Sequence, residues 1–275
     1  MSFTYKYPHP AVTTDCVILT FHQDQLKILL IRRGIEPYKS YWALPGGFLQ
    51  MDESAEECAL RELREETGVT GCTIKQFHTF SAPGRDPRER VITIAFYALM
   101  KWQLAVGADD AEYADWLPLN ALPPLAFDHK EIIELALEHI RRDIYFEPVG
   151  FDLLNETFSM SELQKVYEAI LGKEFDRRNF AKKMKHLGIL EEAEESKPYI
   201  SSLPFLNKEN YHFSSGFCDS GAMPNEENSM PPVVNCFMEE SFESEMAAPR
   251  KKSRSLYRLL KSKYKKLKDE DMIEF

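Results

Sequence analysis

The chain has 275 residues, of which 44% are hydrophobic and 28% are charged, and this composition is typical of globular proteins. Its length allows two domains, each with its own core. No apolar run approaches the roughly 20 residues that a membrane helix needs, so we expect no membrane partner. The five cysteines are scattered and lack C-x-x-C spacing, which argues against a zinc site or a disulfide framework. Free thiols favour a cytoplasmic protein.

The first predicted elements are two strands, Val12–Leu19 and Leu26–Ile31, separated by the polar turn His22–Gln25. A glycine loop with the sequence Pro45-Gly46-Gly47 follows them. Glycine allows a backbone to come close to a metal ion or a phosphate.

A helix is predicted over Ala55–Thr67 because both of its ends carry strong signals. Ser54 is suited to the N-cap position, and Glu57 lies three residues further on, as a capping box requires. Gly68 follows the last helical residue and is a natural terminator. The helix therefore begins directly after the glycine loop.

Two further strands are predicted at Thr73–Phe80 and Val91–Met100, and the second is rich in β-branched and aromatic residues. The segment Leu117–Leu125 contains three prolines and is predicted to be a loop. A helix over His129–Ile144 follows it. Strands that alternate with helices predict an α/β sandwich for this half of the chain.

The pattern changes after Pro148, where short helices replace the strands. One helix is predicted over Ser161–Leu171, with Gly172 as its stop, and a second over Asp176–Leu187, with Asp176 as its N-cap. Two helices joined by a short turn form a candidate helix-turn-helix motif.

The net charge of −10 conceals two opposed blocks. Residues 191–248 hold twelve acidic residues against two lysines, lack periodicity and are rich in Glu, Ser, Asn and Pro. This composition predicts a disordered, acidic insertion. Residues 249–268 hold ten Lys or Arg and no acid, and an acidic tail, 269–275, follows them. The average charge therefore says little about nucleic-acid partners.

The chemistry-bearing motif lies in the helix over Ala55–Thr67. Glu62, Glu65 and Glu66 are three and four residues apart, so one helical face presents three carboxylates within a turn. Such crowding destabilises a helix unless a cation neutralises it. Hard oxygen donors suit Mg²⁺ or Mn²⁺, especially when a substrate adds phosphate oxygens.

Two further residues favour a metal site over an acidic helix face that is only exposed to solvent. Glu53 precedes the capping box and lies outside the helix, so it can fold back towards Arg61 and form an orienting ion pair. Most Glu-rich helical faces are only solvated charge. That alternative leaves the glycine loop, Glu53, Arg61 and the terminal glycine without a common explanation.

Residues 47–69 resemble the Nudix box residue for residue. The resemblance implies the Nudix α/β/α sandwich around a mixed sheet. It also implies hydrolysis of a diphosphate that is attached to a nucleoside, assisted by Mg²⁺ or Mn²⁺. The positions that match the family's pattern are the metal ligands Glu62, Glu65, Glu66 and the Gly47 carbonyl, and the structural ion pair of Glu53 with Arg61.

The general base varies in position across this family. Asp115 is one candidate, because it immediately precedes Trp116–Leu119, which resembles the segment that follows the family's sheet. Glu112 is the other. An ordinary surface carboxylate in a loop explains either residue equally well.

The loop Gly84–Arg90 resembles a segment of Nudix proteins that act on or sense ADP-ribose. Arg85 and Arg88 are candidates to bind phosphate or ribose through their fixed donor forks, together with the backbone of Gly46 and Gly47. The same arginines are also typical of solvated charge beside a strand.

The segments Ala126–His129 and Glu147–Phe151 resemble Nudix-related transcriptional regulators of NAD and sugar metabolism. In those regulators a Nudix domain binds a nucleotide or sugar effector, and a C-terminal winged helix binds DNA. The resemblance covers about residues 8–190 and resumes near Pro249. It implies a Nudix domain over 1–147, a winged-helix domain over 148–268 and a homodimer.

Basic residues after position 150 fit this resemblance. A recognition helix needs base-edge donors and phosphate contacts along one face. The candidates are Arg177, Arg178, Asn179, Lys182 and Lys183 on the second helix, and Arg250, Lys251, Lys252 and Arg254 in a basic return strand of the wing over 250–258. The alternative is a small helical module that uses an ordinary basic surface for dimerisation. The acidic insertion departs from the short hairpin expected in the wing.

Two functions therefore stay open. The first is a Mg²⁺-dependent hydrolase of ADP-ribose or a related nucleoside diphosphate derivative, and the intact Nudix box favours it. Many of the resembling regulators have a degraded box. The second is a transcriptional regulator that only senses such a ligand and binds double-stranded DNA, and the basic residues favour it.

Overall fold

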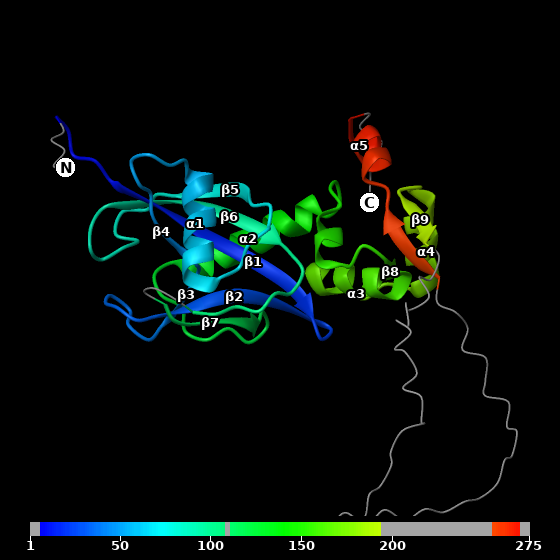
Figure 1. The fold of residues 1–275 in the computed structure, drawn as a ribbon, viewed down its shortest axis with the longest axis horizontal. Helices are drawn as coiled ribbons and strands as arrows, with labels where there is room; N and C mark the ends of the chain where they lie inside the picture. Colours follow the sequence, from blue (N-terminus) through cyan, green and yellow to red (C-terminus); the bar gives the residue numbers. More distant parts are fainter. Residues whose placement is uncertain (1–5, 108–110, 194–254, 270–275) are drawn as a thin grey trace, which may run out of the picture. The chain divides into compact units, whose positions relative to one another are not determined.

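A computed structural model of the chain describes residues 6–107, 111–193 and 255–269 (Figure 1). These residues all belong to one compact unit, Met1–Glu195 with Arg254–Phe275. The other unit, Ser196–Ser253, lies outside the described residues. Most of the acidic insertion and all but the first residue of the acidic tail also lie outside them.

Strand β1 is the centre of a sheet with the order β3-β2-β1-β6-β5, in which β4 also pairs with β1 and β7 with β2. β1 is parallel to β6 and antiparallel to β2 and β4. The expected mixed sheet is therefore confirmed. Its strands are β1 (Ala11–His22), β2 (Gln25–Arg33), β3 (Trp42–Ala43), β4 (Gly46–Phe48), β5 (Lys75–Phe80), β6 (Val91–Leu99) and β7 (Ala111–Pro118).

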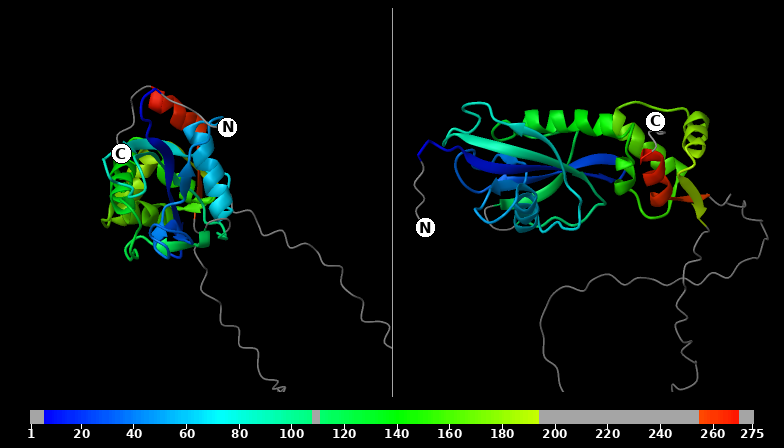
Figure 2. Two further views of the ribbon diagram at one scale, coloured as in Figure 1. Left: turned by 90° about the vertical axis from the view of Figure 1, so that its left-hand side faces the viewer. Right: turned by 90° about the horizontal axis from the view of Figure 1, so that it is seen from above.

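Two helices cover opposite faces of this sheet (Figure 2). Side chains of β1 alternate between the two faces. Val17 and Leu19 belong to the core under α2, whereas Cys16 and Ile18 belong to the core under α1. The helices are α1 (Ala55–Thr67) and α2 (His129–Asp143). This arrangement confirms the α/β/α sandwich.

Helix α1 begins and ends where the sequence predicts. The Ser54 hydroxyl accepts a hydrogen bond from the Glu57 N–H at 3.3 Å, and the Glu57 carboxylate accepts one from the Ser54 N–H at 2.8 Å. Gly68 ends the helix with φ 69°, a left-handed conformation that glycine adopts without strain. The buried Leu63 anchors the helix against the sheet.

The second half of the chain folds as a winged helix. Two helices, α3 (Met160–Leu171) and α4 (Arg177–His186), accompany an antiparallel sheet in the order β8-β10-β9. Phe180 and Met184 of α4 are buried in their core. The remaining elements are η1 (Val149–Leu153), β8 (Phe158–Ser159), β9 (Leu190–Ala193), β10 (Leu256–Leu259) and α5 (Lys261–Asp269).

The loop predicted over Leu117–Leu125 begins too early. Leu117 and Pro118 are the last residues of β7, a strand that the sequence did not indicate. Ala114 and Trp116 are buried, whereas Tyr113 is exposed and Asp115 is half-buried, so the pattern is that of a half-buried strand. Acidic residues and alanines lower the strand propensity of this segment, and pairing with β2 overrides that propensity.

The insertion predicted to be disordered over 191–248 also begins too early. Residues 191–193 belong to β9, which pairs with β10. The Glu191 carboxylate accepts a hydrogen bond from Arg258 Nε at 2.8 Å, so an acidic residue fits the strand because it has a cross-strand partner. The predicted return strand is confirmed for residues 256–258, and β10 extends it to Leu259. Helix α5 was not expected.

No helix in the described part of the chain combines the length and the apolar character that crossing a membrane requires.

Candidate functional site

The glycine loop predicted over Pro45-Gly46-Gly47 is in part a strand, because Gly46 and Gly47 belong to β4 and pair with β1. This segment approaches β1 and α1 very closely. A Cβ atom on Gly46 would lie 2.0 Å from the Thr14 carbonyl oxygen, and one on Gly47 would lie 2.3 Å from the Glu62 carboxyl carbon. Real Cβ contacts are not shorter than 3.0 Å, so position 46, which meets backbone, requires glycine, whereas a side chain at position 47 would displace the Glu62 carboxylate. The loop is therefore held directly beside the acidic face of α1.

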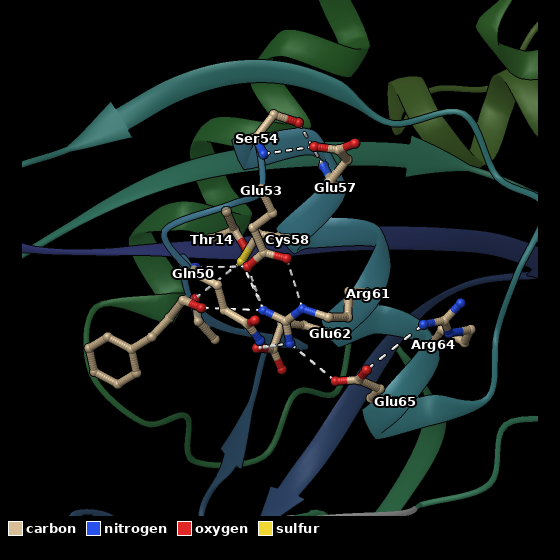
Figure 3. A network of polar contacts seen from close by, with 12 residues as sticks. Thr14, Gln50, Glu53, Ser54, Glu57, Cys58, Arg61, Glu62, Arg64 and Glu65 are labelled. Carbon is tan, nitrogen blue, oxygen red and sulfur yellow. Dashed lines mark hydrogen bonds and ion pairs between the residues drawn. The ribbon is translucent and has the colours of Figure 1, made fainter. Parts of the chain in front are cut away.

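Arg61 ties the segment before α1 to that acidic face (Figure 3). Its Nε and Nη2 atoms donate to the two Glu53 carboxylate oxygens at 2.9 and 2.7 Å. Its Nη1 atom donates to Glu62 at 2.7 Å and to Glu65 at 3.1 Å. The hydrogen bonds from Arg61 lower the pKa of Glu53 to about 2. The expected Glu53–Arg61 ion pair is therefore present, in a forked geometry that lysine could not reproduce.

Glu62 and Glu66 face a common cavity. The buried Glu66 carboxylate accepts a hydrogen bond from the Gly46 N–H at 2.9 Å. Burial, together with the negative charges of Glu62 and Asp15, raises the pKa of Glu66 to about 8. Burial also raises the pKa of Glu62. Two acidic groups in such surroundings favour either a bound proton or a cation.

The oxygen donors fit Mg²⁺ or Mn²⁺ in chemical type, because Glu62, Glu66 and the Gly47 backbone line the same cavity. Glu65 is directed to Arg61 instead, and its side chain is 37% exposed. Within the described ranges, no three acidic, histidine or cysteine side chains are already grouped as metal ligands. The fit therefore rests on Glu62 and Glu66, with Glu65 available only after it leaves Arg61.

The cavity beside these carboxylates has a volume of about 390 Å³, within the range of small-molecule sites. Residues of β1, β2, the glycine loop, α1, the loop before β6 and the start of α2 line it. One part of the lining is aromatic: the Arg88 guanidinium lies 5.3 Å from the ring centre of Phe48 and 5.6 Å from that of Phe127. The cavity thus combines acidic groups with a flat surface suited to a ring.

The two arginines predicted to bind substrate differ in how far the protein itself uses them. Arg85 is almost fully buried and donates to both oxygens of Asp128, from Nε at 2.8 Å and from Nη2 at 2.6 Å. Arg88 is 37% exposed and is held by Asp86 through Nε and Nη2. Both line the cavity. Arg88 presents more of its surface to a ligand, whereas the Arg85 side chain is buried in the lining of the cavity by its contact with Asp128.

Asp15 and His129 are two of the polar residues of the cavity that were not anticipated. His129 Nδ1 accepts a hydrogen bond from the Leu44 N–H at 2.8 Å, and its Nε2 lies 3.5 Å from an Asp15 oxygen. Burial lowers the pKa of His129, so the ring is neutral and carries its proton on Nε2. The available signal was an aspartate beside the apolar run of residues 16–19 in a predicted strand.

The two candidates for the general base lie on β7. Asp115 accepts a hydrogen bond from the Trp116 N–H at 2.7 Å, and it is not among the residues that line the cavity. The backbone of Glu112 belongs to β7, but its side chain lies outside the described residues. The identity of the base stays a prediction.

Helix α4 presents a basic face to solvent. Its buried face holds Phe180 and Met184, and the Asp176 side chain caps its start by accepting from the Asn179 N–H at 2.9 Å. The residues predicted to contact DNA on this helix are all exposed: Arg177, Arg178, Asn179, Lys182 and Lys183. The remaining candidates lie outside the described residues: Arg250, Lys251, Lys252 and Arg254.

Comparison with protein families gives two matches along the chain. The model of the NUDIX domain matches residues 9–136, and the model of the NrtR DNA-binding winged helix domain matches residues 150–201. The two matches fall on the sandwich and on the winged helix, respectively.

Individual relatives match most of the chain or about half of it. The ADPR responsive transcriptional repressor NtrR of Acinetobacter baylyi is 36% identical over 196 residues, which cover 70% of this chain and 78% of the repressor. An ADP-ribose pyrophosphatase of Methanocaldococcus jannaschii is 44% identical over 129 residues, or 46% of this chain and 73% of the pyrophosphatase. The crystal structure of Shewanella oneidensis NrtR complexed with a 27mer DNA is similar with a TM-score of 0.58 and 34% identity, covering 68% of this chain and 90% of that one.

Proposed function

Because this chain belongs to the Nudix family and carries an NrtR-type winged-helix DNA-binding domain, we propose that it is a Mg²⁺-dependent hydrolase of ADP-ribose or a related nucleoside diphosphate derivative that also binds double-stranded DNA. We expect the protein to carry out both activities in the cytoplasm. The expected homodimer stays a prediction.

One observation carries the catalytic part of the proposal. Glu62 and Glu66 face the cavity beside a glycine loop, and the Glu53–Arg61 ion pair beneath them is complete. Glu62, Glu66 and the Gly47 carbonyl would hold the metal, with Glu65 joining them. Bound there, Mg²⁺ supplies charge neutralisation at the diphosphate and a lower pKa for the attacking water.

The protein's own groups would bind and orient the substrate. The Arg88 guanidinium is fixed by Asp86 and lies over the rings of Phe48 and Phe127, so it offers both a cation for a phosphate and a flat surface for a base. Arg61 orients α1 against the loop through Glu53, and thereby sets the separation of Glu62 from Gly47.

The DNA-binding part rests on α4. Its exposed Arg178 and Lys182 lie on the side opposite the buried Phe180 and Met184, and the exposed Arg177 lies at the N-terminal end, where a recognition helix contacts base edges. Lys185, by contrast, lies over the Tyr257 ring at 5.4 Å and packs against the wing. Arg177 and Arg178 are therefore the strongest candidates for contacts with DNA.

A second candidate function is a regulator that binds ADP-ribose without cleaving it. Two observations favour it. Arg61 holds Glu65 away from the cavity, and the repressor of Acinetobacter baylyi matches both regions of the chain. In this case ADP-ribose would change the affinity of the protein for DNA. The carboxylates of the cavity would bind ADP-ribose but would not take part in its cleavage.

The hydrolase and the sensor are separated by measuring product release. The purified protein is incubated with ADP-ribose and a panel of nucleoside diphosphate derivatives, with Mg²⁺ and with EDTA. The proposal expects AMP release with Mg²⁺ and none with EDTA. Absence of turnover for every compound, together with ADP-ribose-dependent release of DNA, would establish the sensor instead.

DNA binding is tested with a site selected from random sequences. Double charge reversal, Arg177→Glu with Arg178→Glu, should abolish binding and leave hydrolysis unchanged. A matched double reversal, Lys101→Glu with Lys130→Glu, changes two exposed lysines of the sandwich and should retain both activities. Affinity should fall steeply with salt, because neutralised phosphates release counterions. If no sequence is enriched at low salt, the DNA-binding proposal is wrong.

A further inference from the structure

Asp15 is a buried carboxylate that the proposed reaction does not use. Side chains of β1 alternate, so Thr13 and Asp15 line the cavity, whereas Thr14 lies 3.4 Å from the Cys58 sulfur under α1. The Asp15 side chain is only 9% exposed, and the residues that follow it in the strand, 16–19, are fully buried apolar groups. A charge in this position needs polar partners to offset its lost hydration.

Among the described residues, the side chains that pair with Asp15 are distant. Arg85 Nη2 lies 3.5 Å from one Asp15 oxygen, and His129 Nε2 lies 3.5 Å from the other. Both distances are at the outer limit of hydrogen bonding. Arg85 gives its short hydrogen bonds to Asp128, and His129 is oriented by the Leu44 N–H. Asp15 therefore has well-positioned neighbours but retains acceptor capacity towards the cavity.

The neighbours of Asp15 restrict what it could accept. A phosphate would be repelled by the carboxylate itself. A metal ion would be repelled by the Arg85 guanidinium, and the described residues group no three metal-binding side chains around Asp15. A neutral donor remains, and hydroxyl groups are donors of this kind.

The position of Asp15 selects a sugar over a base. Asp15 is the β-sheet partner of Gly46, in the loop that would bind the diphosphate. Ribose is bonded directly to the diphosphate, whereas the amino group of a nucleobase lies beyond the ribose. The flat surface of Arg88 and Phe127 is suited to the ring of that base. The hydroxyls of the ribose are thus the donors that come nearest to Asp15.

We propose that Asp15 accepts hydrogen bonds from the hydroxyl groups of a ribose attached to the bound diphosphate, and that Arg85 and His129 are its positioning residues. The inference rests on the proposed binding of ADP-ribose or a related compound. It makes Asp15 a specificity-determining residue: a ligand without the contacted hydroxyls leaves a buried carboxylate unpaired, which the site rejects.

The test is a cycle of two proteins and three ligands, measured by titration calorimetry. The proteins are the unaltered chain and Asp15→Asn. The ligands are ADP-ribose, ADP, which lacks the second ribose, and 2′-deoxy-ADP-ribose, which lacks one hydroxyl of the adenosine. Ca²⁺ replaces Mg²⁺, and chromatography verifies that each ligand stays intact. Because the cycle compares ratios, differences in intrinsic affinity between the ligands cancel.

We expect Asp15→Asn to weaken ADP-ribose binding on the order of 10- to 100-fold, the usual effect of losing a hydrogen bond to a charged group. For the ligand that lacks the contacted hydroxyl, the ratio of the affinities of the two proteins should be close to one. ADP reports on the second ribose and 2′-deoxy-ADP-ribose on the adenosine. The unaltered protein should also bind ADP-ribose more tightly than it binds the ligand that lacks the contacted hydroxyl.

The matched control is Asp143→Asn, which removes an equally buried carboxylate outside the cavity, where Lys75 and the Tyr97 hydroxyl bind it. It should weaken all three ligands equally or not at all. An equal loss for all three ligands in Asp15→Asn would overturn the inference and leave the proposed function intact. No binding of any ligand by the unaltered protein would overturn both.

Discussion

Two polar regions border the cavity, and they differ in charge balance and in origin along the chain. The first, which we call the signature face, contains four carboxylates and one arginine, which forms ion pairs with three of them. In the second, the arginine wall, three carboxylates face two arginines. The signature face consists of Glu53, Arg61, Glu62, Glu65 and Glu66, and the arginine wall consists of Asp15, Arg85, Asp86, Arg88 and Asp128.

The difference indicates what each region is suited to bind. The signature face has unbalanced negative charge, and the burial that raises the pKa of Glu66 favours neutralisation of its carboxylate by a proton or a cation. In the arginine wall, Arg85 and Arg88 each have a carboxylate partner at hydrogen-bond distance. The wall is thus suited to a ligand recognised by shape and hydrogen bonds, whereas the signature face is suited to a metal ion. Four predictions follow from this contrast.

The largest expected effect comes from unbalancing the arginine wall. Arg85→Ala should lower the free energy of unfolding by about 3–5 kcal/mol, because it leaves Asp128 and Asp15 without their buried cation. Urea denaturation measures the change. Arg90→Ala is the matched control, since Arg90 lies in the same loop and donates to backbone oxygens at the surface. Equal stabilities of the two variants would mean that the wall is not held by its ion pairs.

A somewhat smaller effect, on rate, is expected at the signature face. Glu66→Gln should lower turnover of ADP-ribose with Mg²⁺ on the order of 10²- to 10³-fold, as the loss of one group that stabilises a transition state does. Its melting temperature should not fall, because the neutral side chain still accepts from the Gly46 N–H. Glu56→Gln, an exposed change in the first turn, should be silent. Unchanged turnover in Glu66→Gln would refute its role.

The same contrast explains how much of the molecule the sequence predicts. The signature face lies within fourteen residues, 53–66, so helix periodicity and the capping box predict that its side chains lie close together, although Glu65 is directed to Arg61. The wall combines β1 with the 85–88 loop and the start of α2, and only the tertiary fold brings Asp15 to Arg85 and His129. Arg85 was identified, but its burial against Asp128 depends on that fold.

A third prediction concerns pH and metal-free protein. The pKa of Glu66 is about 8 in the folded chain against 4.5 for an ordinary glutamate, so the folded state keeps a proton that the unfolded state releases. Stability from this group is fully present below pH 4.5 and is lost as the pH rises through about 8. The slope is at most about 1.4 kcal/mol per pH unit.

Urea denaturation in EDTA at several pH values between 5 and 9 measures this slope. The unaltered protein should lose stability with rising pH, whereas Glu66→Gln should lose less, because its side chain does not titrate. Excess Mg²⁺ should flatten the curve of the unaltered protein. Parallel curves for the two proteins would show that Glu66 does not titrate in this range, and the charge imbalance of the signature face would then need another explanation.

The smallest effect on stability is expected at Glu65, where the signature face meets solvent. Its carboxylate lies 3.1 Å from Arg61 and its side chain is 37% exposed, so Glu65→Gln should change the free energy of unfolding by less than about 0.5 kcal/mol. If Glu65 leaves Arg61 to join the metal, however, the variant should need about tenfold more Mg²⁺ for half-maximal turnover. Titrating Mg²⁺ at saturating ADP-ribose measures that shift. An unchanged Mg²⁺ requirement would mean that Glu65 stays with Arg61, so that only the carboxylates facing the cavity, Glu62 and Glu66, serve the metal.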